Sequence, residues 1–151
     1  MGLILGIDPG AATGVAAYEG GKLVELLTIK PFQLERFLCG RAGAAPSVMF
    51  EDSRLETRLW NARQKGAYGA ALATARSVGQ VDAWCVLIAD LCADMGISAH
   101  GISPTVKGAK VAASAFGRIT GWTKRCNQHE RDAAMVAWKF RNSVVLKGRP
   151  C

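Results

Sequence analysis

The first apolar run of the chain ends on a single acid. Residues 2–8 are apolar or glycine up to Asp8, and a second apolar run covers residues 13–18. A third apolar-rich run, residues 22–30, follows a pair of glycines. Short apolar runs are typical of buried strands, and glycine between them favours tight turns. The pattern therefore predicts an antiparallel meander of three strands.

Beyond residue 30, helical spacing alternates with short apolar runs. Pro31 suits the first turn of a helix, and Gly96 suits the position just past a helix end. A meander followed by alternating strands and helices predicts an α/β fold with a mixed sheet flanked by helices. The expected elements are a helix from Pro31, a strand over 47–51, a long helix over 72–95, a strand over 97–102, a basic helix over 105–119 and a last helix over 129–141.

Length, composition and net charge indicate the domain organisation and the kind of binding partner to expect. The chain has 151 residues, 50% of them hydrophobic, which predicts a single domain over residues 1–151 with a sizeable core. The net charge of +7 favours a polyanion, nucleic acid first and an anionic membrane surface second, although a basic surface can also serve solubility alone. No run approaches the roughly 20 apolar residues of a membrane span, so we expect no membrane segment.

The cysteines predict a reducing environment. The chain has five, widely scattered and without a CxxC pair, which argues against a zinc knuckle. Cys85 and Cys92 are seven apart within a helical pattern, which puts them on one buried face. Reduced thiols of this kind are typical of a cytoplasmic protein.

Two strands end on acids that could meet. Asp8 closes the first strand and Glu51 closes the fourth. If these strands are parallel neighbours, both carboxylates emerge at the same edge of the sheet. Asp52 would point to the opposite face, because side chains alternate along a strand. Glu51 is therefore the expected partner of Asp8.

A histidine and an acid open the last predicted helix. His129 and Asp132 are three apart, so they share a face, and the small residues 133–134 allow that helix to approach the sheet closely. An acid at the end of a buried strand is costly without a positive partner. Carboxylates together with substrate phosphate oxygens suit Mg²⁺ or Mn²⁺, and a two-metal site can cleave a phosphodiester.

Each of these residues also has a simpler interpretation. Asp8 can shape a turn, and Glu51 can form a surface ion pair with Arg54. His129 can be an ordinary residue at a helix start. Asp132 can be there for its favourable interaction with the helix dipole. The combination is stronger evidence than any one of them.

Four motifs follow one another along the chain. They are GIDPG followed by TG over residues 6–14, a strand ending in Glu51, VGQ over residues 78–80, and an H-x-x-D pair followed by two alanines over residues 129–134. Together they resemble the motifs of the RuvC family of Holliday junction resolvases, within the RNase H-like superfamily. The matching positions are spread over residues 4–138, so the resemblance covers nearly the whole chain.

The resemblance implies an RNase H-like fold, with a five-stranded mixed sheet and helices on both faces. It implies a metal-dependent endodeoxyribonuclease that acts as a homodimer and nicks a four-way junction symmetrically, leaving 5′-phosphates. The catalytic and metal-binding tetrad would be Asp8, Glu51, His129 and Asp132, with His129 either a ligand or a residue that positions water. Two Mg²⁺ ions per site are expected, and Mn²⁺ is expected to substitute for them.

The resemblance and the charge pattern also predict a DNA-binding surface. The family carries DNA-contacting lysines before its third motif, and Lys107 and Lys110 fall in that region. Residues 54–65 interleave basic side chains with an aromatic one, which fits phosphate contacts with stacking. Trp60 would either wedge into the junction or pack against the core or a dimer partner. The residues expected to bind DNA in this segment are Arg54, Arg58, Trp60, Arg63 and Lys65.

The length of the chain separates it from typical cellular members of the family. At 151 residues it is shorter, which suggests a bacteriophage-type relative working in the cytoplasm of a bacterium or a phage-infected cell. Such relatives can also cut forks and flaps, so strict junction specificity is not expected.

Two other functions compete with a nuclease. An actin-like ATPase also begins with a strand, an acid and a glycine-containing hairpin, but it needs two such domains, and 151 residues accommodate one. A non-catalytic module that binds branched DNA would explain the basic charge. It would not explain three carboxylates in one cleft, because these repel phosphate.

Overall fold

The structure, a computed structural model, describes residues 2–56 and 68–143. Within these residues, five strands form one mixed sheet in the order β3-β2-β1-β4-β5. The first three strands are an antiparallel meander, and β4 and β5 add to it in parallel with β1. The strands are β1 (Leu3–Asp8), β2 (Thr13–Glu19), β3 (Lys22–Ile29), β4 (Ser47–Glu51) and β5 (Ser98–Ile102). This sheet confirms the predicted fold class.

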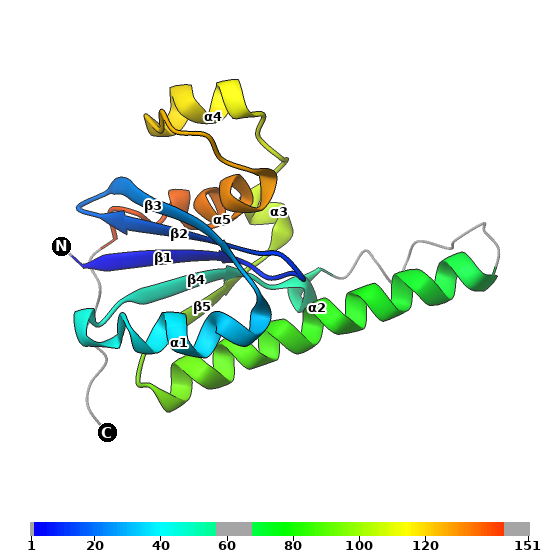
Figure 1. Ribbon diagram of the computed structural model, residues 1–151. Helices are drawn as coiled ribbons and strands as arrows, with labels where there is room; N and C mark the ends of the chain where they lie inside the picture. The colour runs from blue at the N-terminus through cyan, green and yellow to red at the C-terminus, as the bar shows by residue number, and fades with distance from the viewer. Residues whose placement is uncertain (1, 57–67, 144–151) are drawn as a thin grey trace.

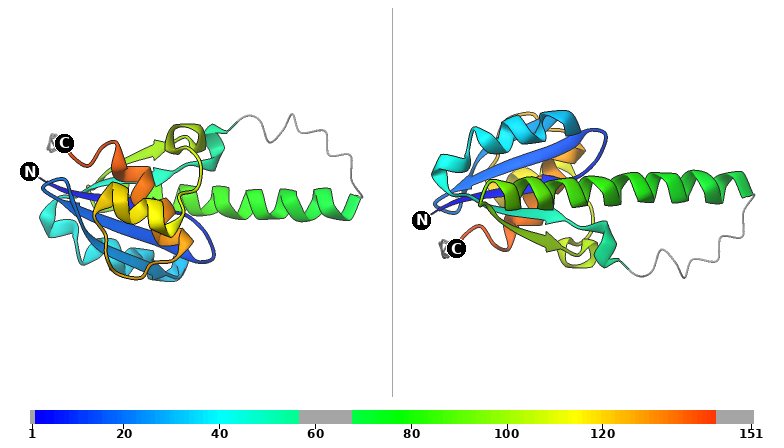
Figure 2. Two further views of the ribbon diagram at one scale, coloured as in Figure 1. Left: turned by 90° about the horizontal axis from the view of Figure 1, so that it is seen from above. Right: turned by 90° about the horizontal axis from the view of Figure 1, so that it is seen from below.

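Five α-helices accompany the sheet in the described part of the chain (Figure 1). They are α1 (Leu34–Cys39), α2 (Tyr68–Asp94), α3 (Pro104–Lys107), α4 (Ala113–Thr120) and α5 (Gln128–Trp138). None of the helices in the described ranges is both long and apolar enough to cross a membrane. The N-terminal half of α2 extends beyond the edge of the sheet, as the views from above and below show (Figure 2).

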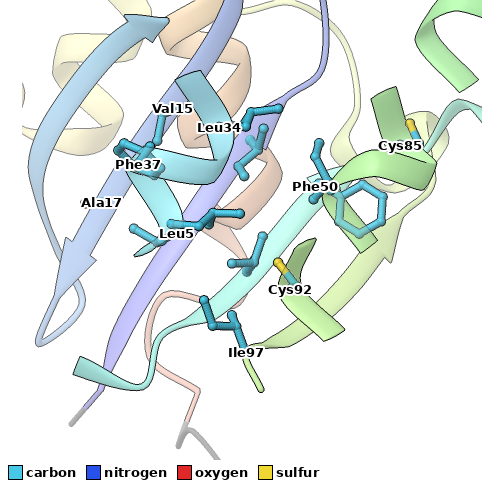
Figure 3. Close-up of a cluster of buried hydrophobic side chains, with 13 residues drawn as sticks. Leu5, Val15, Ala17, Leu34, Phe37, Phe50, Cys85, Cys92 and Ile97 are labelled. Carbon is cyan, nitrogen blue, oxygen red and sulfur yellow. The ribbon is translucent and has the colours of Figure 1, made fainter. Parts of the chain in front are cut away.

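Two apolar cores fill the spaces on the two faces of the sheet. On one face, α1 and α2 cover a cluster that includes Leu5, Phe50, Cys85 and Cys92 (Figure 3). Both cysteines are fully buried, as the helical spacing predicted. On the other face, α4 and α5 cover a second cluster. The helices therefore lie on both sides of the sheet, and the ends of β1 and β4 meet between them.

Strand register brings the two strand-terminal acids together. Because β1 and β4 are parallel and Ile7 pairs with Phe50, the next residues along, Asp8 and Glu51, leave the sheet side by side. Glu51 is itself in register with Ile102 at the end of β5. The carboxyl ends of three neighbouring strands thus share one edge, where sheets of this kind place their ligands.

Glycine allows α5 to lie unusually close to β1 and β2. A Cβ at Gly6 would be 2.1 Å from the carbonyl oxygen of Ala133, and one at Gly14 would be 1.9 Å from that of His129. Only a hydrogen fits at these two positions. The hydroxyl of the buried Tyr18 donates a hydrogen bond to the Ala134 carbonyl at 2.9 Å and fixes the same helix against β2.

The predicted basic helix over residues 105–119 is wrong, because the chain forms two helices there. Helix α3 ends at Lys107, where Gly108 turns the backbone with φ 89° and ψ −167°. Glycine enters this region at little cost, whereas other residues rarely do. The last helix is also shorter than predicted and ends at Trp138.

Candidate active site

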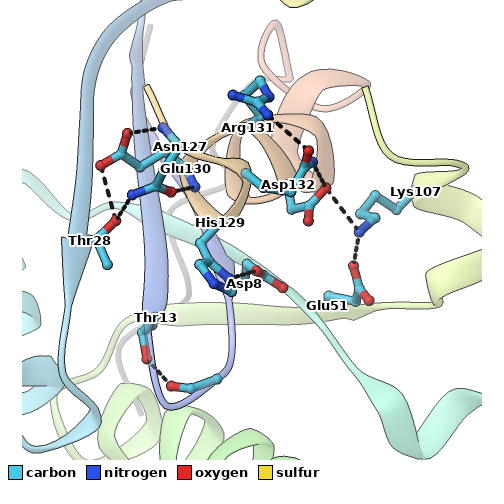
Figure 4. Close-up of polar contacts among 12 residues, drawn as sticks. Asp8, Thr13, Thr28, Glu51, Lys107, Asn127, His129, Glu130, Arg131 and Asp132 are labelled. Carbon is cyan, nitrogen blue, oxygen red and sulfur yellow. Dashed lines mark hydrogen bonds and ion pairs between the residues drawn. The ribbon is translucent and has the colours of Figure 1, made fainter. Parts of the chain in front are cut away.

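Three carboxylates gather at the shared edge of the sheet. Asp8 comes from the end of β1, Glu51 from the end of β4 and Asp132 from the second turn of α5 (Figure 4). The Asp132 side chain is 7% exposed and that of Asp8 is 16% exposed. The sequence prediction placed these acids together, and the structure brings them together.

Crowding and burial change the proton affinity of Asp8. Burial raises the pKa of this carboxyl to about 6, with the negative charge of Glu51 as the second cause. A hydrogen bond from His129 acts in the opposite direction, as does the charge of Lys107. Concentrated negative charge of this kind favours binding of a cation.

His129 lies beside Asp8. Its Nδ1 is 3.3 Å from Oδ2 of Asp8, and its ring is about half exposed. The backbone of His129 is held against Gly14 by the close approach of α5. The imidazole therefore joins the acids from the side open to solvent, where a substrate can reach it.

Lys107 supplies the positive charge nearest to the acids. Its Nζ is 2.6 Å from Oε2 of Glu51 and 3.6 Å from Oδ1 of Asp132. The side chain is only 8% exposed. Burial disfavours the charged ammonium, but Glu51 and Asp132 outweigh it and hold the pKa of Lys107 above its ordinary value. The lysine therefore neutralises part of the acidic cluster.

A glutamine and an arginine, neither of them predicted as site residues, orient Asp132. Gln128 Nε2 donates to Oδ1 of Asp132 at 2.9 Å, and Arg131 Nη2 donates to Gln128 Oε1 at 2.9 Å. Arg131 also donates to the backbone carbonyls of Val111 and Cys126. It thereby joins the segments on either side of α4 to α5. The i,i+4 spacing of Gln128 and Asp132 on one helix was a readable signal for the first of these contacts. The contacts of Arg131 with Val111 and Cys126 left no such signal, because these partners lie on other segments.

A capping box fixes the start of α5. The Asn127 side chain accepts from the backbone N–H of Glu130 at 3.0 Å, and the Glu130 carboxylate accepts from the N–H of Asn127 at 3.0 Å. Thr28 on β3 joins both, since it donates to Glu130 and accepts from Asn127. The Asn-x-x-Glu spacing was a readable signal for this cap.

The residues after Glu51 turn toward the α2 side of the sheet. Arg54 pairs with Asp52 through two contacts of 2.8 Å, so the ion pair considered between Arg54 and Glu51 is not formed. Ser53 donates to Asp82 of α2 at 2.6 Å. The thiol of Cys85 donates to the Glu51 carbonyl at 3.5 Å. These contacts hold the backbone at Glu51 against α2.

The predicted DNA-binding residues are divided between several places. Lys107 lies in the acidic cluster, and Lys110 lies exposed in the segment between α3 and α4. Two of the guanidinium nitrogens of Arg54 are held by Asp52, which leaves Nη1 outside that contact. The other four, Arg58, Trp60, Arg63 and Lys65, lie outside the described residues.

The donor set suits a hard divalent cation, but its present arrangement holds an ammonium. Across residues 2–56 and 68–143, no three His, Cys, Asp or Glu side chains converge closely enough to hold a metal ion as they stand. Carboxylate oxygens and one imidazole are ligands that Mg²⁺ and Mn²⁺ accept. Asp8, Glu51, His129 and Asp132 fit such an ion in their chemistry, with Lys107 lying between two of them.

The five-stranded mixed sheet with helices on both faces is the RNase H-like fold. Solved structures of Thermus thermophilus RuvC share it. One, a complex with a Holliday junction substrate, superimposes with a TM-score of 0.60 at 19% identity over 91% of each chain. A second RuvC structure from the same organism gives 0.53 at 19% identity, over 90% of this chain and 91% of that one. No family model and no curated protein matches the sequence.

Proposed function

We propose that this protein is a metal-dependent, structure-selective endodeoxyribonuclease that nicks Holliday junctions symmetrically and leaves 5′-phosphates. The observation that carries the proposal is the meeting of Asp8, Glu51 and Asp132, with His129, at one edge of an RNase H-like sheet. A likeness of fold to RuvC over 91% of the chain supports it. Forks and flaps are further candidate substrates.

The chemistry of the site suits hydrolysis of a phosphodiester. When bound by Asp8, Glu51, His129 and Asp132, two Mg²⁺ or Mn²⁺ ions would supply water activation and charge stabilisation at the leaving oxygen. Asp8 and Glu51 are fixed by strand register, so they present oxygens in a set direction. His129 is open to solvent beside Asp8 and can orient a water or a phosphate oxygen.

Charge and symmetry shape the proposed substrate. The net charge of +7 favours a polyanion, and Lys110 is exposed in the segment between α3 and α4, where it can contact a phosphate. A four-way junction offers two equivalent strands, so a twofold homodimer would place one active site on each. Symmetric nicking follows from that arrangement.

A single substitution tests the catalytic assignment. Asp8→Asn is expected to lower the rate of Mg²⁺-dependent nicking of a synthetic four-way junction by at least about a hundredfold, because the amide lacks the charge and one of the acceptor oxygens of the carboxylate. Binding of the junction should persist. Asp90→Asn on the exposed side of α2 is the matched control and should cut like the unsubstituted protein.

The substrates are compared side by side, with Mg²⁺ and with Mn²⁺. Four-way junction, fork, flap and linear duplex are each labelled on every strand, so that the positions and symmetry of the nicks are visible. Undiminished cleavage by Asp8→Asn would contradict the assignment of this cluster as the active site. Binding of branched DNA without any cleavage by the unsubstituted protein would favour a non-catalytic DNA-binding module.

A further inference from the structure

Lys107 occupies a position fixed from several sides. It is the last residue of the four-residue helix α3, which follows β5 almost directly, and Gly108 then turns the chain away. The ammonium of Lys139, beyond the end of α5, donates to the Val106 carbonyl at 2.7 Å. These contacts bring the Lys107 side chain to the edge of the sheet where the acids meet.

The ammonium of Lys107 contacts carboxylate oxygens that a metal ion would also need as ligands. It lies 2.6 Å from Oε2 of Glu51 and 3.6 Å from Oδ1 of Asp132, with 8% of the side chain exposed. Three neighbouring carboxylates repel one another, and a buried ammonium needs negative partners. The lysine therefore neutralises part of the negative charge of the acids in the metal-free protein. A divalent cation has to compete with it for Glu51 and Asp132.

We propose that Lys107 is an internal counter-ion that stabilises the acidic site in the metal-free protein and releases Glu51 and Asp132 when a divalent cation binds. The inference rests on the proposed function, since that proposal assigns these two residues as metal ligands. The ammonium contacts one oxygen of each carboxylate, Oε2 and Oδ1, so its departure frees one ligand atom on each side. Metal affinity is therefore set partly by a competitor within the chain.

The competition links metal binding to DNA binding. A phosphate of bound DNA attracts a lysine ammonium, and it favours the state in which Lys107 has left Glu51 and Asp132. A ligand that prefers one of two states strengthens every other ligand that prefers the same state. DNA and metal should therefore each increase the affinity of the other, and the site should hold metal weakly before DNA arrives.

The alternative role for Lys107 is that of a fixed structural support. In that case its ammonium would stay between Glu51 and Asp132 whether or not a metal is present. Removing it would weaken the fold without improving metal binding. Metal affinity in the absence of DNA separates the two roles and does not depend on nuclease activity.

The experiment measures Mn²⁺ affinity by titration calorimetry without DNA, for the whole protein and three variants. Lys107→Met removes the competing charge and should bind Mn²⁺ about tenfold more tightly. Lys107→Arg keeps the charge and should stay near the unsubstituted protein. Lys110→Met removes one exposed charge from the next segment and should change affinity less than about twofold, because solvent and salt screen it.

Thermal unfolding supplies a second measurement. The stabilisation that Mg²⁺ gives should be larger for Lys107→Met than for the unsubstituted protein, because a ligand that binds the folded state more tightly stabilises it more at the same concentration. Lys107→Gln serves in both assays if the methionine variant does not fold. Unchanged or weaker Mn²⁺ binding by Lys107→Met, or by Lys107→Gln in its place, would overturn the counter-ion role. Failure of the unsubstituted protein to cut any branched DNA would instead overturn the proposed function and leave the affinity comparison valid.

Discussion

At the scale of single residues, two missing side chains decide how the acidic site is assembled. Gly6 and Gly14 face the backbone of α5, and a Cβ at either position would be about 2 Å from a helix carbonyl oxygen. Asp132 and His129 reach Asp8 because these two positions carry only hydrogen. The glycines thus have a direct role in the geometry of the site.

Adding one methyl group tests this close contact. Gly14→Ala should lower the free energy of unfolding by about 1–3 kcal/mol, because α5 has to move away from β2 to make room. Gly79→Ala on α2 is the control, since a Cβ there meets nothing within 4 Å. It should raise stability by about 0.5–1 kcal/mol, as alanine does in place of glycine within a helix.

Urea denaturation measures both variants, and nicking of a four-way junction measures the site. Gly14→Ala should cut more slowly than Gly79→Ala, because His129 and Asp132 move with α5. Equal stability of the two variants would show that α5 does not depend on the hydrogen at position 14.

Some of the site residues were predictable from the sequence, but most of their contacts were not. Asp8 and Glu51 were predictable because each follows an apolar run, and the run fixes where its strand ends. The ion pairs were not predictable. Arg54 follows two acids, Glu51 and Asp52, and the structure pairs it with Asp52. The contact of Lys107 with Glu51 depends on α3 and β4 meeting in space, and spacing along the chain carries no record of it.

At the scale of elements, α5 supplies two of the four candidate site residues, His129 and Asp132. Its first turn is fixed by several hydrogen bonds. The capping box of Asn127 and Glu130 fixes the first turn, and Thr28 joins that turn to β3. The sequence predicted the start of this helix to within one residue but placed its end three residues too late, at 141 instead of Trp138. The prediction of one helix over residues 105–119 was wrong, because Gly108 ends α3 within a run that otherwise favours helix.

Two substitutions separate the cap from its attachment to the sheet. Asn127→Ala should lower the free energy of unfolding by about 0.5–2 kcal/mol, since the N–H of Glu130 loses its acceptor. Thr28→Val keeps the capping box and loses the hydroxyl that joins it to β3, so its effect should be smaller. Chemical denaturation followed by circular dichroism measures both, and a larger loss for Thr28→Val would assign the main role to the attachment.

At the scale of the whole molecule, a protein of positive net charge carries an acidic cluster at one edge of its sheet. The net charge is +7, while three carboxylates meet where β1 and β4 end and α5 begins. The mixed sheet was predictable, because a meander followed by strand–helix alternation allows few arrangements. The order of its strands comes from the structure. The extension of α2 beyond the sheet was not predictable, because helical spacing records the length of a helix and carries no information about what lies beside it.

The charge distribution predicts steep salt dependence of DNA binding. Junction affinity should fall linearly on a double logarithmic plot against salt concentration, because bound lysines and arginines release counterions from the DNA. Lys110→Ala should reduce the slope by about 1 if Lys110 contacts a phosphate. Fluorescence anisotropy with a labelled junction measures the slope. A junction affinity that does not change with salt concentration would contradict binding through lysine and arginine contacts with phosphates.

The hydrogen bond between His129 and Asp8 joins residues 121 positions apart in the chain. A ribosome makes Asp8 well before α5, and it makes α5 after every strand of the sheet. The growing chain therefore carries β1, β4 and their two acids for most of its synthesis without the helix that completes the cluster. On this order of events, an incomplete chain has no assembled acidic site, and any activity that the site confers begins only when residues 128–138 have left the ribosome and docked.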